Sequence, residues 1–148
     1  MQKISPFLWF DSQAEEASKF YASVFKDSEV TNVTKDAKGS VMWVSFKLEG
    51  VEFMAINGGP KFEFTEAISF FVNCDGQEEV DYLWNKLSAH PESEQCGWLK
   101  DKYGLSWQII PKQLGELLAK DKSGKVMQAM LKMKKIEVSK LEKAHYGK

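Results

Sequence analysis

The residue whose chemistry most needs an explanation is Gln108, a neutral amide inside the apolar run LSWQII at 105–110. An amide in a buried strand needs a hydrogen-bonding partner, because burying it unpaired costs free energy. Two explanations are open. Gln108 either faces a polar cavity, where it could orient a ligand, or is satisfied by a neighbouring backbone group, which is the more common case. The interpretation of function depends on which of the two holds.

Other residues with reactive side chains lack partners at the spacing that catalysis needs. Ser69 and Cys96 have no His close in sequence, and no nucleophile motif surrounds them. The acidic pairs at 15–16 and 78–79 fall in predicted first turns of helices, where negative charge favours the helix dipole. The charged turn at 100–102 is expected to be solvated. These residues are therefore interpreted as structural, and the catalytic residues are unknown.

The charge of the chain is unevenly distributed, although its net value is −1. Residues 1–110 hold 10 lysines and 17 acidic residues, whereas residues 111–148 hold 10 lysines and 4 acidic residues. The sequence contains no arginine, which argues against recognition of nucleic acid, because that recognition relies on the guanidinium fork. We therefore expect no nucleic-acid partner and interpret the basic C-terminal segment as a solvated helical face.

Targeting and redox signals point to a cytoplasmic protein. No apolar run approaches the roughly 20 residues that span a bilayer, so no membrane partner is expected. The start MQKISPFLWF is too short and too aromatic for a secretory signal. Cys74 and Cys96 form no CxxC motif, so reduced thiols without a zinc site are expected.

Two similar runs of predicted elements must position these residues. In the first, a strand at 3–10 leads into a helix with capping-box spacing at Ser12 and Glu15, and strands follow at 28–35, 41–48 and 51–57. In the second, a strand at 67–73 leads into a helix that Asp75 caps, then into a loop and a closing hairpin at 96–111 with its turn at 101–104. The order of elements indicates an internal repeat of a βαβββ unit, whose second copy has a shorter middle strand.

Helices are predicted after Pro111, at 113–119, 123–134 and 137–144. The middle one carries a methionine-rich apolar stripe, which we interpret as a packing surface, either within the chain or against a second copy. The stripe comprises Val126, Met127, Met130, Leu131 and Met133. The length fits a single domain, residues 1–148, with module one at 1–60, module two at 61–111 and a helical tail at 112–148.

Several segments together resemble a known family. The stretches PFLWFDSQAEEASKFYASVF, SFFVNCD, QCGWLKDKYGLSWQIIP and KVMQAMLKMKKIEVSKLEKA are similar to the PhnB-like branch of the vicinal oxygen chelate superfamily. This superfamily includes glyoxalase I, bleomycin-resistance proteins and extradiol dioxygenases, and members of the branch are often labelled 3-demethylubiquinone-9 3-methyltransferase-like. The resemblance implies an α+β fold in which two βαβββ modules curve a mixed sheet around a cavity. It also implies a homodimer.

The resemblance further implies positions for four metal ligands, usually His, Gln or Glu, on the first and last strands of each module. The corresponding positions here are Ile4 or Pro6, Phe53, Ala67 or Ile68, and Gln108. Only Gln108 offers a donor, and His90 and His145 lie off the ligand strands. A divalent transition metal generally needs several converging donors, so we expect no metal and no other cofactor.

The expected function is binding of a small organic molecule in the cavity, with any reaction unknown. Strand alternation predicts that Leu8, Phe10, Phe53, Ala55, Asn57, Ser69, Phe71 and Gln108 line it. Methyl transfer is not expected, because no glycines are spaced as GxG and the chain has no room for a nucleotide-binding sheet. The alternatives are a metal-dependent lyase, isomerase or dioxygenase, and an antibiotic-sequestering resistance protein.

Overall fold

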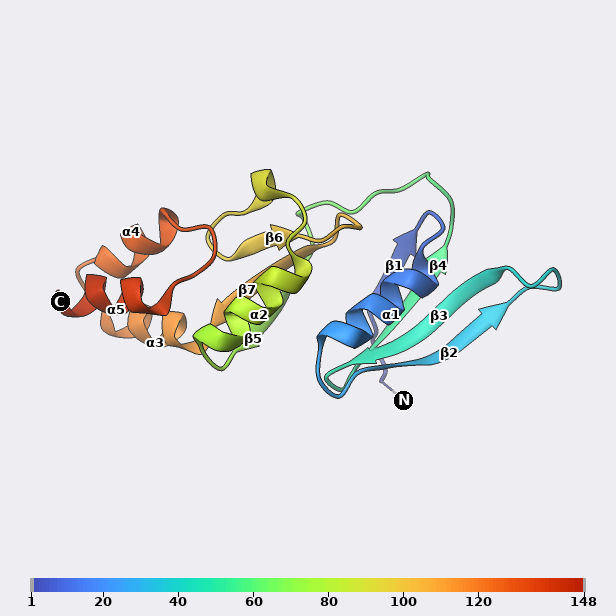
Figure 1. Ribbon diagram of the computed structural model, residues 1–148, viewed down its shortest axis with the longest axis horizontal. Coiled ribbons are helices and arrows are strands. Elements are labelled where there is room, and N and C mark those ends of the chain that lie inside the picture. Colours follow the sequence, from blue (N-terminus) through green and yellow to red (C-terminus); the bar gives the residue numbers. More distant parts are fainter. Residues whose placement is uncertain (1, 148) are drawn as a thin grey trace. The chain divides into compact units, whose positions relative to one another are not determined.

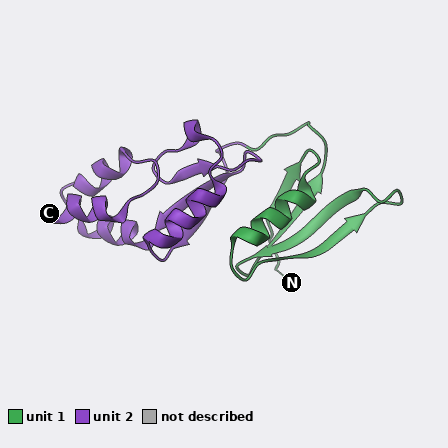
Figure 2. Ribbon diagram, in the orientation of Figure 1, with its two compact units in different colours: residues 1–64 green, residues 65–148 purple. Residues whose placement is uncertain are grey.

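The computed structural model describes residues 2–147, and the chain divides into two compact units, unit 1 at 1–64 and unit 2 at 65–148 (Figure 2). In each unit a small mixed sheet packs with helix, one helix in unit 1 and several in unit 2, so the predicted α+β class is confirmed. The description of the chain as a single domain stays a prediction.

Unit 1 is a four-stranded sheet in the order β1-β4-β3-β2, with α1 across one face (Figure 1). Its elements are β1 Phe7–Phe10, α1 Ala14–Val24, β2 Glu29–Lys35, β3 Val41–Leu48 and β4 Val51–Asn57. The β1–β4 pair is parallel and the other pairs are antiparallel. This is the βαβββ order that the sequence predicts.

The core of unit 1 lies between α1 and the sheet. Phe46 is almost fully buried, with its ring 6.3 Å from Tyr21 of α1 and 5.2 Å from Phe53 on the adjacent strand. Ala17 and Val44 are fully buried. Alternate residues of β3 and β4 therefore face the helix, because side chains in a strand point to opposite sides with a period of two.

The N-terminus of α1 is satisfied from a distant strand. The side chain of Asn57, at the end of β4, accepts a hydrogen bond from the backbone N–H of Ala14 at 2.8 Å. The N-cap position falls on Gln13, whose side chain makes no capping bond. The predicted capping box at Ser12 and Glu15 is therefore wrong, because a tertiary contact supplies the acceptor instead.

Unit 2 is a three-stranded sheet in the order β5-β7-β6, followed by three helices. The β5–β7 pair is parallel and the β6–β7 pair is antiparallel. Its elements are β5 Ser69–Cys74, α2 Gln77–Leu87, the short 3₁₀ helix η1 Pro91–Ser93, β6 Trp98–Lys100, β7 Ser106–Pro111, α3 Lys112–Lys120, α4 Lys125–Leu131 and α5 Val138–Tyr146.

Unit 2 therefore has one strand fewer than the βαβββ repeat predicted from the sequence. The segment after α2 forms a loop that contains η1, with Pro91 at its start. Proline has no N–H for a strand ladder and its fixed φ suits a first helical position, so residues 91–93 form a helical turn instead of a strand. The N-cap of α2 is Gly76, without a side-chain capping bond, so the predicted Asp75 cap is also wrong.

The tail helices pack with the end of β7 in an apolar core of unit 2. Its buried residues are Ile110, Leu114, Leu117, Val126, Met133, Ile136 and Leu141. Two residues of the predicted methionine stripe belong to this core, whereas Met127 and Leu131 are exposed. Packing within the chain thus explains only part of the stripe. Within the described residues, no helix is both long and apolar enough to cross a membrane.

Candidate functional site

The two faces of the unit 2 sheet differ in character. The Cys74 thiol lies beside Glu79 of α2, and burial together with that carboxylate raises the pKa of the thiol to about 12. The side of the sheet that carries Cys74 therefore faces α2. Trp107 and Ile109 share this side and are buried.

The opposite side, here called the polar face, carries two rows of paired residues. Directly paired residues on neighbouring strands point to the same side of a sheet. The first row is Ser69 on β5, Ser106 on β7 and Lys100 on β6. The second row is Phe71, Gln108 and Trp98, in the same strand order.

Gln108 is held by a side chain of the polar face. Its Nε2 donates a hydrogen bond to Ser69 Oγ at 3.0 Å. The partner is thus a cross-strand hydroxyl and not the backbone group that one of the two sequence interpretations required. Phe71 lies beside Gln108 on the adjacent strand and is 59% exposed. The second row therefore combines an oriented amide with an accessible aromatic ring.

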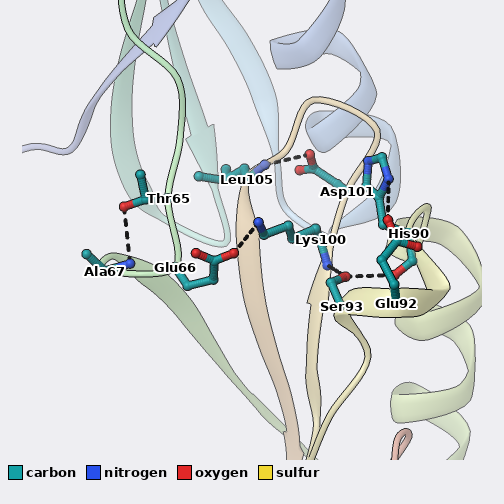
Figure 3. Close-up of polar contacts among 9 residues, drawn as sticks. All are labelled: Thr65, Glu66, Ala67, His90, Glu92, Ser93, Lys100, Asp101 and Leu105. Atoms are coloured by element: carbon teal, nitrogen blue, oxygen red, sulfur yellow. Dashed lines mark hydrogen bonds and ion pairs between the residues drawn. The ribbon is translucent and has the colours of Figure 1, made fainter.

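The first row is charged at one end. The Lys100 ammonium forms an ion pair with Glu66, in the segment that leads into β5 (Figure 3). The hydrogen bond and the charge of Lys100 hold the pKa of Glu66 below its ordinary value. Since β7 lies between β5 and β6, this pair spans the strand that carries Ser106. Ser106 Oγ is buried and has no hydrogen-bond partner within residues 2–147.

The turn between β6 and β7 is built on a buried carboxylate. Asp101 is fully buried, and its Oδ1 accepts hydrogen bonds from the backbone N–H groups of Tyr103 at 2.8 Å and Leu105 at 3.1 Å. Its Oδ2 accepts from Trp107 Nε1 at 2.9 Å. The expectation that the 100–102 cluster is solvated is therefore wrong for Asp101. This carboxylate fixes the hairpin that places Lys100 opposite Ser106.

The eight residues predicted to line a cavity fall in two separate groups. Ser69, Phe71 and Gln108 come together on the polar face of unit 2. The other five are on the α1 side of the unit 1 sheet, with four of them buried and the fifth bonded to the start of α1: Leu8, Phe10, Phe53, Ala55 and Asn57. The contacts of this second group are those of core residues, and its role as a cavity lining stays a prediction.

The residues at the four implied metal positions do not fit a divalent metal ion. Phe53 is stacked in the unit 1 core, and Ile68 is an exposed hydrocarbon. The amide of Gln108 already donates to Ser69. Within residues 2–147, no three or more His, Cys, Asp or Glu side chains converge in a way that could hold a metal. A single amide oxygen is too few donors for such an ion.

Comparisons with known proteins place the chain in a family. The model of a family described as 3-demethylubiquinone-9 3-methyltransferase matches residues 2–110. A PhnB protein from Bacillus cereus, whose description carries the same enzyme name, is 38% identical, and the alignment covers 74% of this chain and 99% of that one with a TM-score of 0.65. The chain belongs to this family.

More distant structures also match this family member. A protein from Pseudomonas aeruginosa is 20% identical with a TM-score of 0.56, over 76% of this chain and 98% of that one, and shows a shared fold. A glyoxylase/bleomycin resistance protein/dioxygenase domain from Frankia sp. EAN1pec is 14% identical with a TM-score of 0.45, over 75% of this chain and 92% of that one. No curated protein matches the chain.

The family match ends at Ile110, so the polar face lies inside it and the helical tail lies outside it. Sequence reasoning found Ser69, Phe71 and Gln108 but not Lys100 or Ser106. The register of the three strands is the signal that joins them. It could not be read from the sequence, because the pairing of β5 with β7 joins segments that lie far apart in the chain.

Proposed function

We propose that this family member binds a small organic molecule on the polar face of unit 2. The observation that supports this most is the Gln108–Ser69 hydrogen bond beside the exposed ring of Phe71. An oriented amide next to an aromatic surface is a common composition of small-molecule sites. In this proposal Gln108 and Ser69 orient polar atoms of the ligand, while Phe71 packs on an apolar or planar part.

Methyl transfer, which the family description names, is not part of the proposal. Nucleotide-type methyl donors are usually held by a doubly wound parallel sheet with a glycine-rich first turn. The chain has two small sheets that each contain antiparallel pairs, and its segments between β1 and α1 and between β5 and α2 carry no GxG. Support for that activity would have to come from a measured reaction.

The experiment that tests binding is a fragment screen observed by NMR on the ¹⁵N-labelled full chain. Ligands of the proposed site shift the amides of Phe71 and Gln108, and the variants Gln108→Ala and Phe71→Ala weaken their binding. Val51→Ala, which alters an exposed side chain on β4 of unit 1, is the control and leaves binding unchanged. Fragments that bind elsewhere, or whose affinity is the same for both variants as for the unaltered protein, contradict the proposal.

The proposed binding takes place without a metal ion, as the donor set at the implied positions suggests. Elemental analysis of protein purified without chelator tests this part separately. Stoichiometric metal that is lost in Gln108→Ala would favour the alternative, a metal-dependent lyase, isomerase or dioxygenase.

We also propose a cytoplasmic homodimer. Both cysteines are free, as expected in a reducing compartment, and the exposed Met127 and Leu131 on α4 offer an apolar contact. Light scattering at micromolar concentration that shows only monomer would contradict the dimer.

A further inference from the structure

Ser106 is a buried member of the polar face, and its hydroxyl has no hydrogen-bond partner among the residues that the structure describes. The residue is 1% exposed. A buried hydroxyl without a partner costs free energy, and such groups in proteins often serve a ligand. By register Ser106 lies between Ser69 and Lys100 and points to the same side of the sheet. A ligand group on this row would meet a hydroxyl donor there.

Lys100 supplies a positive charge that can be exchanged. Its side chain is 25% exposed, whereas the Glu66 side chain that pairs with it is 64% exposed. Exposed ion pairs contribute little to stability, because solvent screens them and both side chains lose freedom. Glu66 therefore holds Lys100 only weakly in place. A carboxylate brought by a ligand could replace the carboxylate of Glu66 at the same ammonium group.

We infer that Lys100 and Ser106 form a subsite for the carboxylate of a small organic acid, and that Glu66 pairs with the Lys100 ammonium until the ligand displaces it. This inference rests on the proposed binding at the polar face. One ammonium and one hydroxyl match a singly charged carboxylate, whereas phosphate groups are usually held by several donors. The row with Phe71 is two residues further along the strands, about 7 Å away. The ligand class is thus a carboxylic acid with a planar or apolar body.

The test compares benzoate with its neutral analogue benzamide, using NMR titrations of the full chain. The subsite predicts that benzoate shifts the amides of Lys100 and Ser106 and binds about tenfold or more tightly than benzamide. Lys100→Met removes this preference. Glu66→Gln increases benzoate affinity several-fold, because it removes the internal competitor. Ser106→Ala weakens benzoate several-fold.

Two control variants separate a specific role of Lys100 from a general effect of net charge. Lys102→Met makes the same change of charge two residues away, on an exposed turn residue, and leaves benzoate binding unchanged. Lys100→Arg keeps the charge and retains at least part of the preference, and the spectrum of each variant reports whether it is folded.

The inference and the proposed function can fail separately. Equal binding of benzoate and benzamide at Phe71 and Gln108 would overturn the carboxylate subsite and leave the proposed function standing. Equal losses in Lys100→Met and Lys102→Met would overturn it too, because the effect would then be one of net charge. If neither compound shifts the polar face, the subsite is overturned, and the fragment screen decides on the function independently.

Discussion

At the scale of single residues, Asp101 determines the geometry of the closing hairpin. A carboxylate is costly to bury unless several donors satisfy it, and here two backbone N–H groups and the Trp107 indole do so. Each of these bonds joins the turn to itself or to β7. The hairpin therefore depends on the charge of Asp101 and not only on its small size.

Replacing Asp101 with Asn should destabilise the protein by about 2 kcal/mol or more, because an amide Nδ2–H₂ would face the Trp107 N–H as a second donor. Urea unfolding measures the change in the free energy of unfolding. The matched control is Asp36→Asn, in an exposed turn where Oδ1 accepts from the backbone N–H groups of Lys38 and Ser40. A similar loss in both variants would show that the indole contact is unimportant.

The two cysteines should differ in reactivity toward thiol reagents. Cys74 is fully buried and the pKa of its thiol is raised to about 12, so very little thiolate forms at neutral pH. Cys96 is partly exposed. Mass spectrometry after iodoacetamide treatment of the native protein should find Cys96 modified and Cys74 intact, with both modified in urea. Rapid modification of native Cys74 would contradict the buried position.

At the scale of elements, backbone N–H groups at two helix starts find acceptors that the sequence alone does not identify. The start of α1 takes its acceptor from Asn57, at the end of β4. The start of α4 takes its acceptor from Asp121, whose Oδ2 accepts from the backbone N–H of Val126 at 2.9 Å. The first contact joins α1 to the end of β4, and the second joins α4 to the end of α3.

Asn57→Ala should lower the free energy of unfolding by about 1 kcal/mol, the usual cost of a lost helix cap. Ser12→Ala, which changes the residue that the sequence favours as the cap, should have an effect close to zero. Thermal and urea unfolding of the two variants provide the comparison. A larger loss of stability in Ser12→Ala than in Asn57→Ala would instead support the predicted capping box.

Acid should weaken the start of α4. The hydroxyl of Ser123 and the N–H of Val126 lower the pKa of Asp121 from an ordinary 3.8 to about 2. A carboxylate with a lowered pKa stabilises the folded state above pH 3.8, and that contribution is lost as the pH falls toward 2. An NMR titration of the Asp121 carboxyl carbon should give a midpoint well below 3.8. A midpoint near 4 would contradict the contacts.

At the scale of the whole molecule, the helical tail follows the part of the chain that matches the family model, which ends at Ile110. The backbone N–H groups of Cys96 and Gly97 donate to the carbonyls of Met133 and Lys134, each at 2.8 Å. A Cβ on Gly97 would lie 2.5 Å from Ile110 Cδ1, and its φ of +87° also favours glycine. The tail and the sheet of unit 2 therefore share one core.

Ile136→Ala should destabilise the chain by about 3 kcal/mol, because it leaves a cavity in the tail core, where Ile136 is fully buried. Ile68→Ala removes the same side chain from an exposed position of unit 2 and should cost less than about 1 kcal/mol. If unit 2 unfolds cooperatively with its tail, the amides of β7 lose protection in Ile136→Ala. Unchanged protection of β7 would mean that the tail folds separately.

The sequence by itself determined the α+β class, the order of elements in unit 1, the turn at 101–104 and the tail helices, because these depend on local periodicity and turn residues. It also indicated that Gln108 needs a polar partner. Only the tertiary structure decided that this partner is Ser69, that Asn57 caps α1, that Asp101 is buried and that Lys100 is paired across from Ser106. The first two facts depend on contacts between residues far apart in sequence. The last two depend on the exact register of the closing hairpin, where a one-residue shift would reverse which side chains share a face.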